Sequence, residues 1–139
     1  MKKFPSFLFL GGAIVALSYL ADFYLNLGLL TGWWVANIFH FFGGIYAFFF
    51  IRAFYYLTEK YHKTITAFWF EMVIFAGGAL ILGVFWEWYE FVFYYKFGTF
   101  AISQWSVTTY MDTIYDLMFD LVGATFAGAY LFIRNGKNK

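Results

Sequence analysis

Four long apolar stretches constrain this chain more than any other feature. A helix needs about 20 apolar residues to cross the hydrocarbon core of a bilayer, and the stretches are close to this length or longer. They cover residues 4–21, 34–57, 67–94 and 111–133. Because their apolar residues are continuous rather than alternating, they favour helices over the strands of a membrane barrel. The sequence therefore predicts an all-α, polytopic membrane protein with four transmembrane helices in a single domain, residues 1–139.

The composition excludes several other kinds of protein. Hydrophobic residues make up 63% of the 139 residues and charged residues only 12%, about half the share of a soluble domain. A chain of this size cannot bury so much apolar surface in a soluble core. A net charge of +1 provides no basic surface for a nucleic acid, and the absence of cysteine excludes thiolate metal ligands.

Lysine and arginine lie almost entirely on one side of the predicted helices. All of the 9 basic residues except Lys96 lie before the first stretch, near the connection between the second and third, or after the fourth. Because basic residues mark the cytoplasmic side, we expect both termini inside the cell (N-in, C-in). Residues 4–21 form too long an apolar run, without a clear cleavage site, for a signal peptide. We therefore expect a retained anchor in a multi-pass protein of the cell (inner) membrane.

Acidic residues gather at the opposite, outer end of the predicted bundle. Asp112, Asp116 and Asp120 are spaced four apart, so they share one helix face. At 1.5 Å per residue, His40 and Glu87 lie at nearly the same depth, roughly 10 Å below the outer surface. Small residues follow on the same faces, as is typical where membrane helices pack closely. We expect one polar cluster in the outer leaflet, to which Asp22 and Asn26, at the outer end of the first helix, also contribute.

One imidazole among several carboxylates is a plausible ligand set for a divalent cation such as Zn²⁺, Mn²⁺, Fe²⁺ or Mg²⁺. The predicted metal ligands are His40, Glu87, Asp116 and Asp120. Glu90 and Asp112, which lie shallower, are candidate general bases or supports for the ligands. A bound metal activates water and polarises a phosphoryl or acyl group. The first hypothesis is therefore an enzyme or metal-binding protein that acts on a lipid-linked or amphipathic substrate.

Two other functions fit the same residues. Polar side chains bond across membrane helices, so the acids fit a network that fixes helix packing in a structural or partner subunit of a membrane complex. Asp112 also suits the N-cap of the last helix. Crowded carboxylates without a metal suit a proton or cation pathway, although little except Glu71 continues it toward the inner side. Glu71 itself is expected to pair with Lys60 or Lys63. Whether the protein is an enzyme stays open.

Three sequence elements resemble those of the uncharacterised YjdF-like inner-membrane proteins. Residues 40–44 (HFFGG) are similar to their H-F-x-G element, and residues 85–90 (FWEWYE) to their W-E-x-x-E element. Residues 112–123 (DTIYDLMFDLVG) are similar to their D-T-x-x-D-x-x-x-[DN]-x-x-G element. More distantly, the layout resembles that of VanZ-like proteins, small membrane proteins linked with glycopeptide resistance. The resemblance implies a shared site in the membrane without naming its reaction.

Overall fold

Three long helices form the continuous parts of the structure, which is a computed structural model. It describes residues 33–58, 67–97 and 107–136, together with residues 6, 9, 11–13, 16, 17 and 20. The helices are α2 (Trp33–Leu57), α3 (Phe68–Phe97) and α4 (Val107–Gly136). Each contains a segment long and apolar enough to cross a membrane, namely Ala36–Leu57, Phe68–Val92 and Tyr110–Arg134. The predictions of an all-α fold and of a multi-pass membrane protein are therefore confirmed.

Two of the helices extend beyond the apolar stretches that predicted them. α3 ends at Phe97 rather than near residue 94, and α4 begins at Val107 rather than near residue 111. Apolar composition marks the hydrocarbon region, whereas a helix continues into the interface, where water satisfies its terminal groups. The expectation that Asp112 caps the last helix is therefore wrong, because Asp112 lies inside α4.

The first predicted stretch, residues 4–21, falls largely outside the described residues. Those of its members that are described are helical. Gly11 and Gly12 lie against Tyr46 of α2, since a Cβ atom added at Gly11 would be 3.2 Å from that ring and one at Gly12 2.7 Å from its hydroxyl. These contacts place the two glycines beside α2. A fourth span and the N-in, C-in orientation stay predictions.

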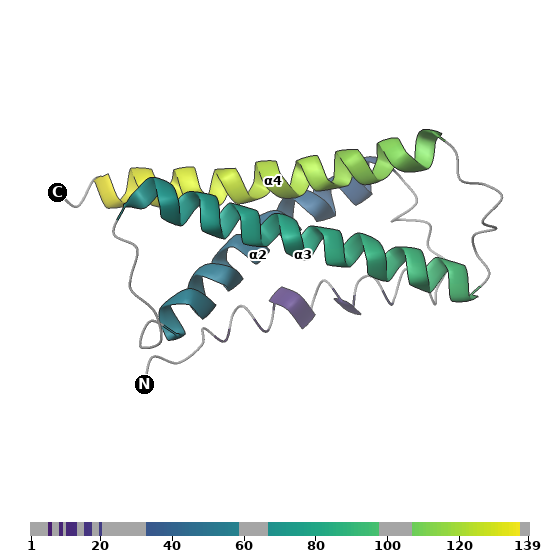
Figure 1. Cartoon of the computed structure of the whole chain (residues 1–139), viewed down its shortest axis with the longest axis horizontal. Helices are drawn as coiled ribbons and strands as arrows, with labels where there is room; N and C mark the ends of the chain where they lie inside the picture. Colours follow the sequence, from purple (N-terminus) through teal and green to yellow (C-terminus); the bar gives the residue numbers. More distant parts are fainter. Residues whose placement is uncertain are drawn as a thin grey trace.

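The three helices pack against one another in a single bundle. α3 and α4 run in opposite directions, and α2 crosses behind them at an oblique angle (Figure 1). α2 contacts both, and its contact with α4 is the most extensive of the three. Outward-facing side chains are mostly large and apolar, as Trp69, Val73 and Ile133 illustrate with exposed fractions of 71%, 70% and 59%. Such a surface is suited to contact with lipid.

Two glycines bring the backbones of α2 and α4 into contact. A Cβ atom at Gly44 of α2 would overlap the carbonyl group of Asp120 in α4. A Cβ atom at Gly123 of α4 would likewise overlap the carbonyl group of Phe41 in α2. Small residues permit this close approach of membrane helices. Because His40 adjoins Phe41 in α2, the crossing also sets the distance between His40 and Asp120.

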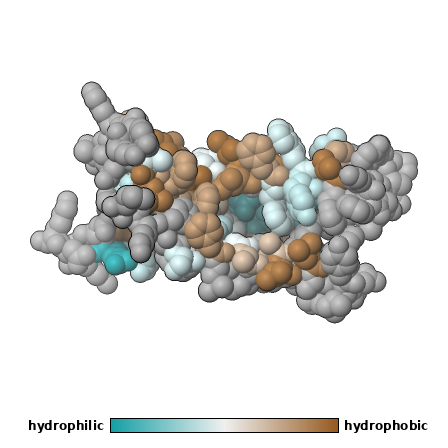
Figure 2. Space-filling view, turned by 90° about the horizontal axis from the view of Figure 1, so that it is seen from below, coloured by the Kyte–Doolittle hydropathy of each residue, from teal (hydrophilic) through white to brown (hydrophobic). Residues whose placement is uncertain are grey.

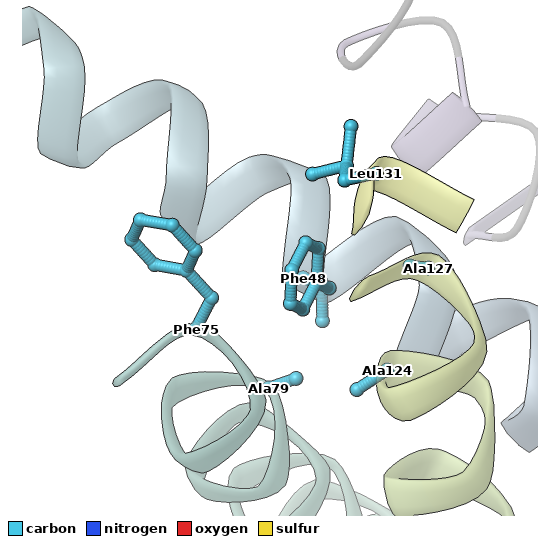
Figure 3. Packing of buried hydrophobic residues seen from close by; sticks show 7 residues of the cluster. Phe48, Phe75, Ala79, Ala124, Ala127 and Leu131 are labelled. Atoms are coloured by element: carbon cyan, nitrogen blue, oxygen red, sulfur yellow. The ribbon is translucent and has the colours of Figure 1, made fainter. Parts of the chain in front are cut away.

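An apolar core lies between the crossing and the Leu57 end of α2. Phe48 of α2 and Phe75 of α3 pack edge to face, with ring centroids 5.6 Å apart and an interplanar angle of 89°, a favourable arrangement for aromatic pairs. Ala79 of α3 and Ala124 of α4 are also buried and point toward one another in Figure 3. Short side chains between the helices thus leave room for the two rings and hold the bundle together.

A hydrogen bond joins the ends of α2 and α3 beyond this core. The Tyr56 hydroxyl donates to Oε1 of Glu71 at 2.6 Å, and the guanidinium of Arg52 lies 5.0 Å from the centre of the Tyr56 ring. The described partner of Glu71 is therefore a tyrosine. Lys60 and Lys63, its expected partners, lie outside the described residues.

The glycine crossing generates a stability prediction. Gly44→Ala and Gly123→Ala should each lower the free energy of unfolding by about 1–3 kcal/mol, because the new methyl group collides with a backbone carbonyl that cannot rotate away. Gly77→Ala in α3 is the matched control, since nothing lies within 4 Å of its added Cβ. It should raise helix stability by up to about 1 kcal/mol. Denaturant unfolding in detergent micelles measures the free energy of unfolding of all three variants. Similar decreases at the three positions would contradict a close contact of α2 and α4 at these glycines.

Candidate functional site

His40, Glu87 and Asp116 lie at a common depth near one end of the bundle. His40 follows the start of the Ala36–Leu57 span, Glu87 precedes the end of Phe68–Val92, and Asp116 follows the start of Tyr110–Arg134. At 1.5 Å per residue, each lies about 6–9 Å inside its span. α2 and α4 begin at the end where α3 finishes, so alternating helix direction brings the three side chains to one level.

The Nε2 atom of His40 faces two carboxylates. It lies 3.7 Å from Oε1 of Glu87 and 3.7 Å from Oδ1 of Asp116. Both oxygens are buried, and neither accepts a hydrogen bond from any described residue. Leaving such an oxygen unsatisfied in an apolar environment is costly. The arrangement therefore favours a cation or a proton between the three groups.

Neighbouring side chains hold the other polar atoms of His40 and Glu87. Nδ1 of His40 lies 3.3 Å from Oδ2 of Asp120. The hydroxyl of Thr113 donates to Oε2 of Glu87 at 2.9 Å. Each contact crosses between two helices. Together they leave one nitrogen of the imidazole and one oxygen of Glu87 directed toward Asp116.

The structure thus brings together the four residues that the sequence predicted as metal ligands. Glu87 and Asp116 lie at one nitrogen of the His40 imidazole, and Asp120 lies at the other. One ligand atom from each of His40, Glu87 and Asp116 can be chosen so that all three lie within 4.8 Å of one another. Asp120 contacts the other nitrogen of the same imidazole. Asp116 and Asp120 are almost fully buried, with exposed fractions of 4% and 5%. Their convergence with His40 is a property of the fold, whereas metal binding stays a prediction.

The other predicted site residues lie closer to the end of the bundle. Glu90 lies one turn beyond Glu87 in α3, and Trp86 donates from Nε1 to its Oε1 at 3.0 Å. Asp112 is exposed, one turn before Asp116. Asp22 and Asn26 lie outside the described residues.

Two polar residues next to the cluster were missed by reasoning from charge alone. Thr113 lies three residues before Asp116, and Asn37 lies three residues before His40 and is only 2% exposed. This spacing places each on the same helix face as its neighbour. Following uncharged polar residues at helical spacing, as well as acids and histidine, would have found both.

Polar atoms are visible from one side of the molecule. Figure 2 shows strongly hydrophilic atoms set back near the middle of the face, between pale and hydrophobic surroundings. Among the described residues, the buried polar or charged ones are Asn37, His40, Asp116 and Asp120. These four residues are therefore largely removed from the surface of the bundle, in an environment where electrostatic interactions are stronger than in water.

The spacing of the three inward-facing atoms fits a small divalent cation. Ligand atoms bound at about 2.1 Å to a tetrahedral metal lie about 3.4 Å apart. Nε2 lies 3.7 Å from each carboxylate oxygen, and ligand atoms of the three residues lie within 4.8 Å of one another, so the side chains would have to move inward to bind the metal. One imidazole nitrogen with two carboxylate oxygens is a donor set that Zn²⁺, Mn²⁺ and Fe²⁺ accept.

The contact between Thr113 and Glu87 generates a second prediction. Thr113→Val removes the hydroxyl but keeps the shape, so it should lower the free energy of unfolding by about 0.5–2 kcal/mol, as for other hydrogen bonds between membrane helices. Thr125→Val is the matched control, because the Thr125 hydroxyl bonds to the Leu121 carbonyl of its own helix at 2.8 Å. Unfolding in detergent compares the two variants. An equal or smaller loss at Thr113 would contradict its part in the site.

Comparison with known proteins places the chain in a family. A family model described as a predicted membrane protein (DUF2238) matches residues 5–137. No curated protein and no solved structure matches the chain. The match extends over all three described helices and the whole polar cluster. This small multi-pass membrane protein with a buried histidine–carboxylate cluster therefore belongs to the DUF2238 family.

Proposed function

We propose that this protein binds one divalent metal ion through His40, Glu87 and Asp116 and uses it to act on a lipid-linked or amphipathic substrate. The observation that carries the proposal is a pair of buried carboxylate oxygens that face one imidazole nitrogen and accept no hydrogen bond from the described residues. A cation between the three atoms would satisfy all of them at once. One proton can satisfy only one of the two oxygens.

The donor set supports a catalytic rather than a purely structural metal. Structural zinc sites are usually closed by four protein ligands, whereas catalytic sites use three and leave a position for water or substrate. Three ligand atoms converge here. A metal so held would act as a Lewis acid and activate bound water.

Two acidic residues are proposed to transfer protons beside the metal. Glu90 and Asp112 lie one turn from Glu87 and Asp116, respectively, toward the end of the bundle. Trp86 restrains the Glu90 carboxylate, as a positioned general base requires. Asp112 is exposed and so can exchange protons with the surroundings of the bundle.

The location of the site supports an amphipathic substrate. We place the cluster in the outer leaflet of the cell (inner) membrane, with four spans and both termini inside. Arg52 and Arg134 lie toward the opposite ends of α2 and α4 from the cluster, which fits this orientation. A substrate that reaches a site about 6–9 Å inside the spans needs an apolar part to enter and a polar group to react. The resemblance to YjdF-like and VanZ-like proteins agrees with a membrane site of this kind.

A structural role is the second candidate function. It is favoured by the two contacts that cross between helices, His40 with Asp120 and Thr113 with Glu87. A proton pathway has less support, because the described core between the cluster and Glu71 is built from apolar side chains such as Phe48 and Phe75.

Metal binding by the purified protein tests the proposal. The wild type should bind one equivalent of Zn²⁺ or Mn²⁺ in detergent, measured by calorimetry and metal analysis. His40→Ala and Asp116→Asn should weaken binding by at least about 100-fold, more than a supporting residue does. Glu71→Gln is the control, since it removes a carboxylate at the other end of the bundle and should leave affinity unchanged. A folded wild type that binds neither metal would favour the structural role.

Metal should also stabilise the folded protein. At a free concentration 100 times its dissociation constant, a ligand that binds only the folded state raises the free energy of unfolding by about 2.7 kcal/mol. The wild type and Glu71→Gln should show this increase in denaturant unfolding, and His40→Ala should not. An equal increase in all three would indicate that the metal binds elsewhere.

A further inference from the structure

The carboxylate of Asp120 occupies a notch between two glycines at the junction of the three helices. A Cβ atom at Gly83 of α3 would overlap Oδ2 of Asp120, and one at Gly43 of α2 would lie 3.5 Å from Oδ1. Asp120 itself belongs to α4 and is only 5% exposed. The absence of side chains at two positions thus gives one carboxylate room to reach the imidazole of His40.

Asp120 approaches the opposite side of that imidazole from the other two acids. Its Oδ2 lies 3.3 Å from Nδ1 of His40, whereas Glu87 and Asp116 face Nε2. The two ring nitrogens point in different directions in the plane of the ring. One metal ion bound at Nε2 therefore cannot also be held by Asp120 unless the side chains rearrange.

We propose that Asp120 is a positioning residue that accepts a hydrogen bond from Nδ1–H of His40, and not the fourth metal ligand that its sequence position suggests. The inference rests on the proposed metal site. A carboxylate at Nδ1 selects the tautomer in which Nε2 carries no hydrogen and can bind a metal. It also makes the imidazole a stronger donor and fixes the plane of the ring.

The packing around Asp120 explains how the ring is held in one orientation. The α2–α4 crossing brings the Asp120 backbone against Gly44, and the Gly83 notch limits where its carboxylate can move. The imidazole is also buried, with an exposed fraction of 8%. A ring restrained on one side by Asp120 presents Nε2 to Glu87 and Asp116 before any metal arrives, which lowers the cost of binding.

The first test replaces the carboxylate itself. Asp120→Asn keeps the size but can present an amide N–H to Nδ1, which selects the wrong tautomer. Zn²⁺ affinity should fall by about 10–100-fold, the range for residues that support a ligand, and stoichiometry should stay at one. Nitrogen NMR of zinc-loaded wild type should show a hydrogen on Nδ1 and the metal on Nε2. Glu71→Gln controls for the loss of one negative charge.

The second test moves Asp120 without removing its charge. Gly83→Ala introduces a methyl group where the carboxylate lies, so it should weaken Zn²⁺ binding by a similar factor. Gly77→Ala makes the same change in the same helix, in open space, and should leave affinity unchanged. Circular dichroism and a native elution volume establish that each variant is folded.

The outcomes separate the two proposals. A wild type that binds no metal overturns both. A wild type that binds zinc, with unchanged affinity in Asp120→Asn and in Gly83→Ala, overturns the positioning role but leaves the metal site intact. Zinc bound at Nδ1 would instead indicate that Asp120 is a ligand. So would the loss of one oxygen ligand of zinc in Asp120→Asn, measured by X-ray absorption spectroscopy.

Discussion

The contact between the backbones of α2 and α4 is the constraint on which the rest of the structure depends. Gly44 and Gly123 each lie against a carbonyl group of the other helix, so the helices cannot rotate or slide without a collision. In α2, His40 lies one turn before Gly44, and in α4 the carbonyl group that Gly44 contacts belongs to Asp120 itself. A packing requirement of the bilayer interior, where small residues let helices approach, thus also fixes the geometry of the polar cluster.

The cluster and the apolar core divide the bundle between them. Phe48, Phe75 and the neighbouring alanines fill the part between the crossing and the Leu57 end of α2, and the polar side chains of the cluster lie in a layer near the other end. Burying carboxylates among apolar helices is costly unless they are paired. Helix packing can offset that cost, but it does not supply the missing partner of Oε1 in Glu87 or Oδ1 in Asp116. The proposed metal ion would contact both oxygens at once.

Much of this arrangement follows from the sequence. The length of the apolar stretches predicts the three described spans, and counting residues from their ends predicts that His40, Glu87 and Asp116 reach one depth. Helix rotation is harder to predict, because it depends on contacts such as that of Gly83 with Asp120, which no single-helix pattern contains. Depth and spacing along the helices therefore predict four ligands, whereas in the structure Asp120 lies at a different imidazole nitrogen from Glu87 and Asp116. The sequence also does not predict that α4 begins at Val107, because a helix extends beyond its apolar segment.

The position of a bound metal tests this account most directly. Anomalous diffraction at the zinc absorption edge, from crystals of the zinc-loaded protein in a lipid phase, locates the ion independently of any activity. The account predicts one strong peak about 2.0–2.2 Å from Nε2 of His40, between Glu87 and Asp116, with Asp120 on Nδ1. A peak elsewhere in the bundle, or none in protein that is saturated with zinc, would contradict it.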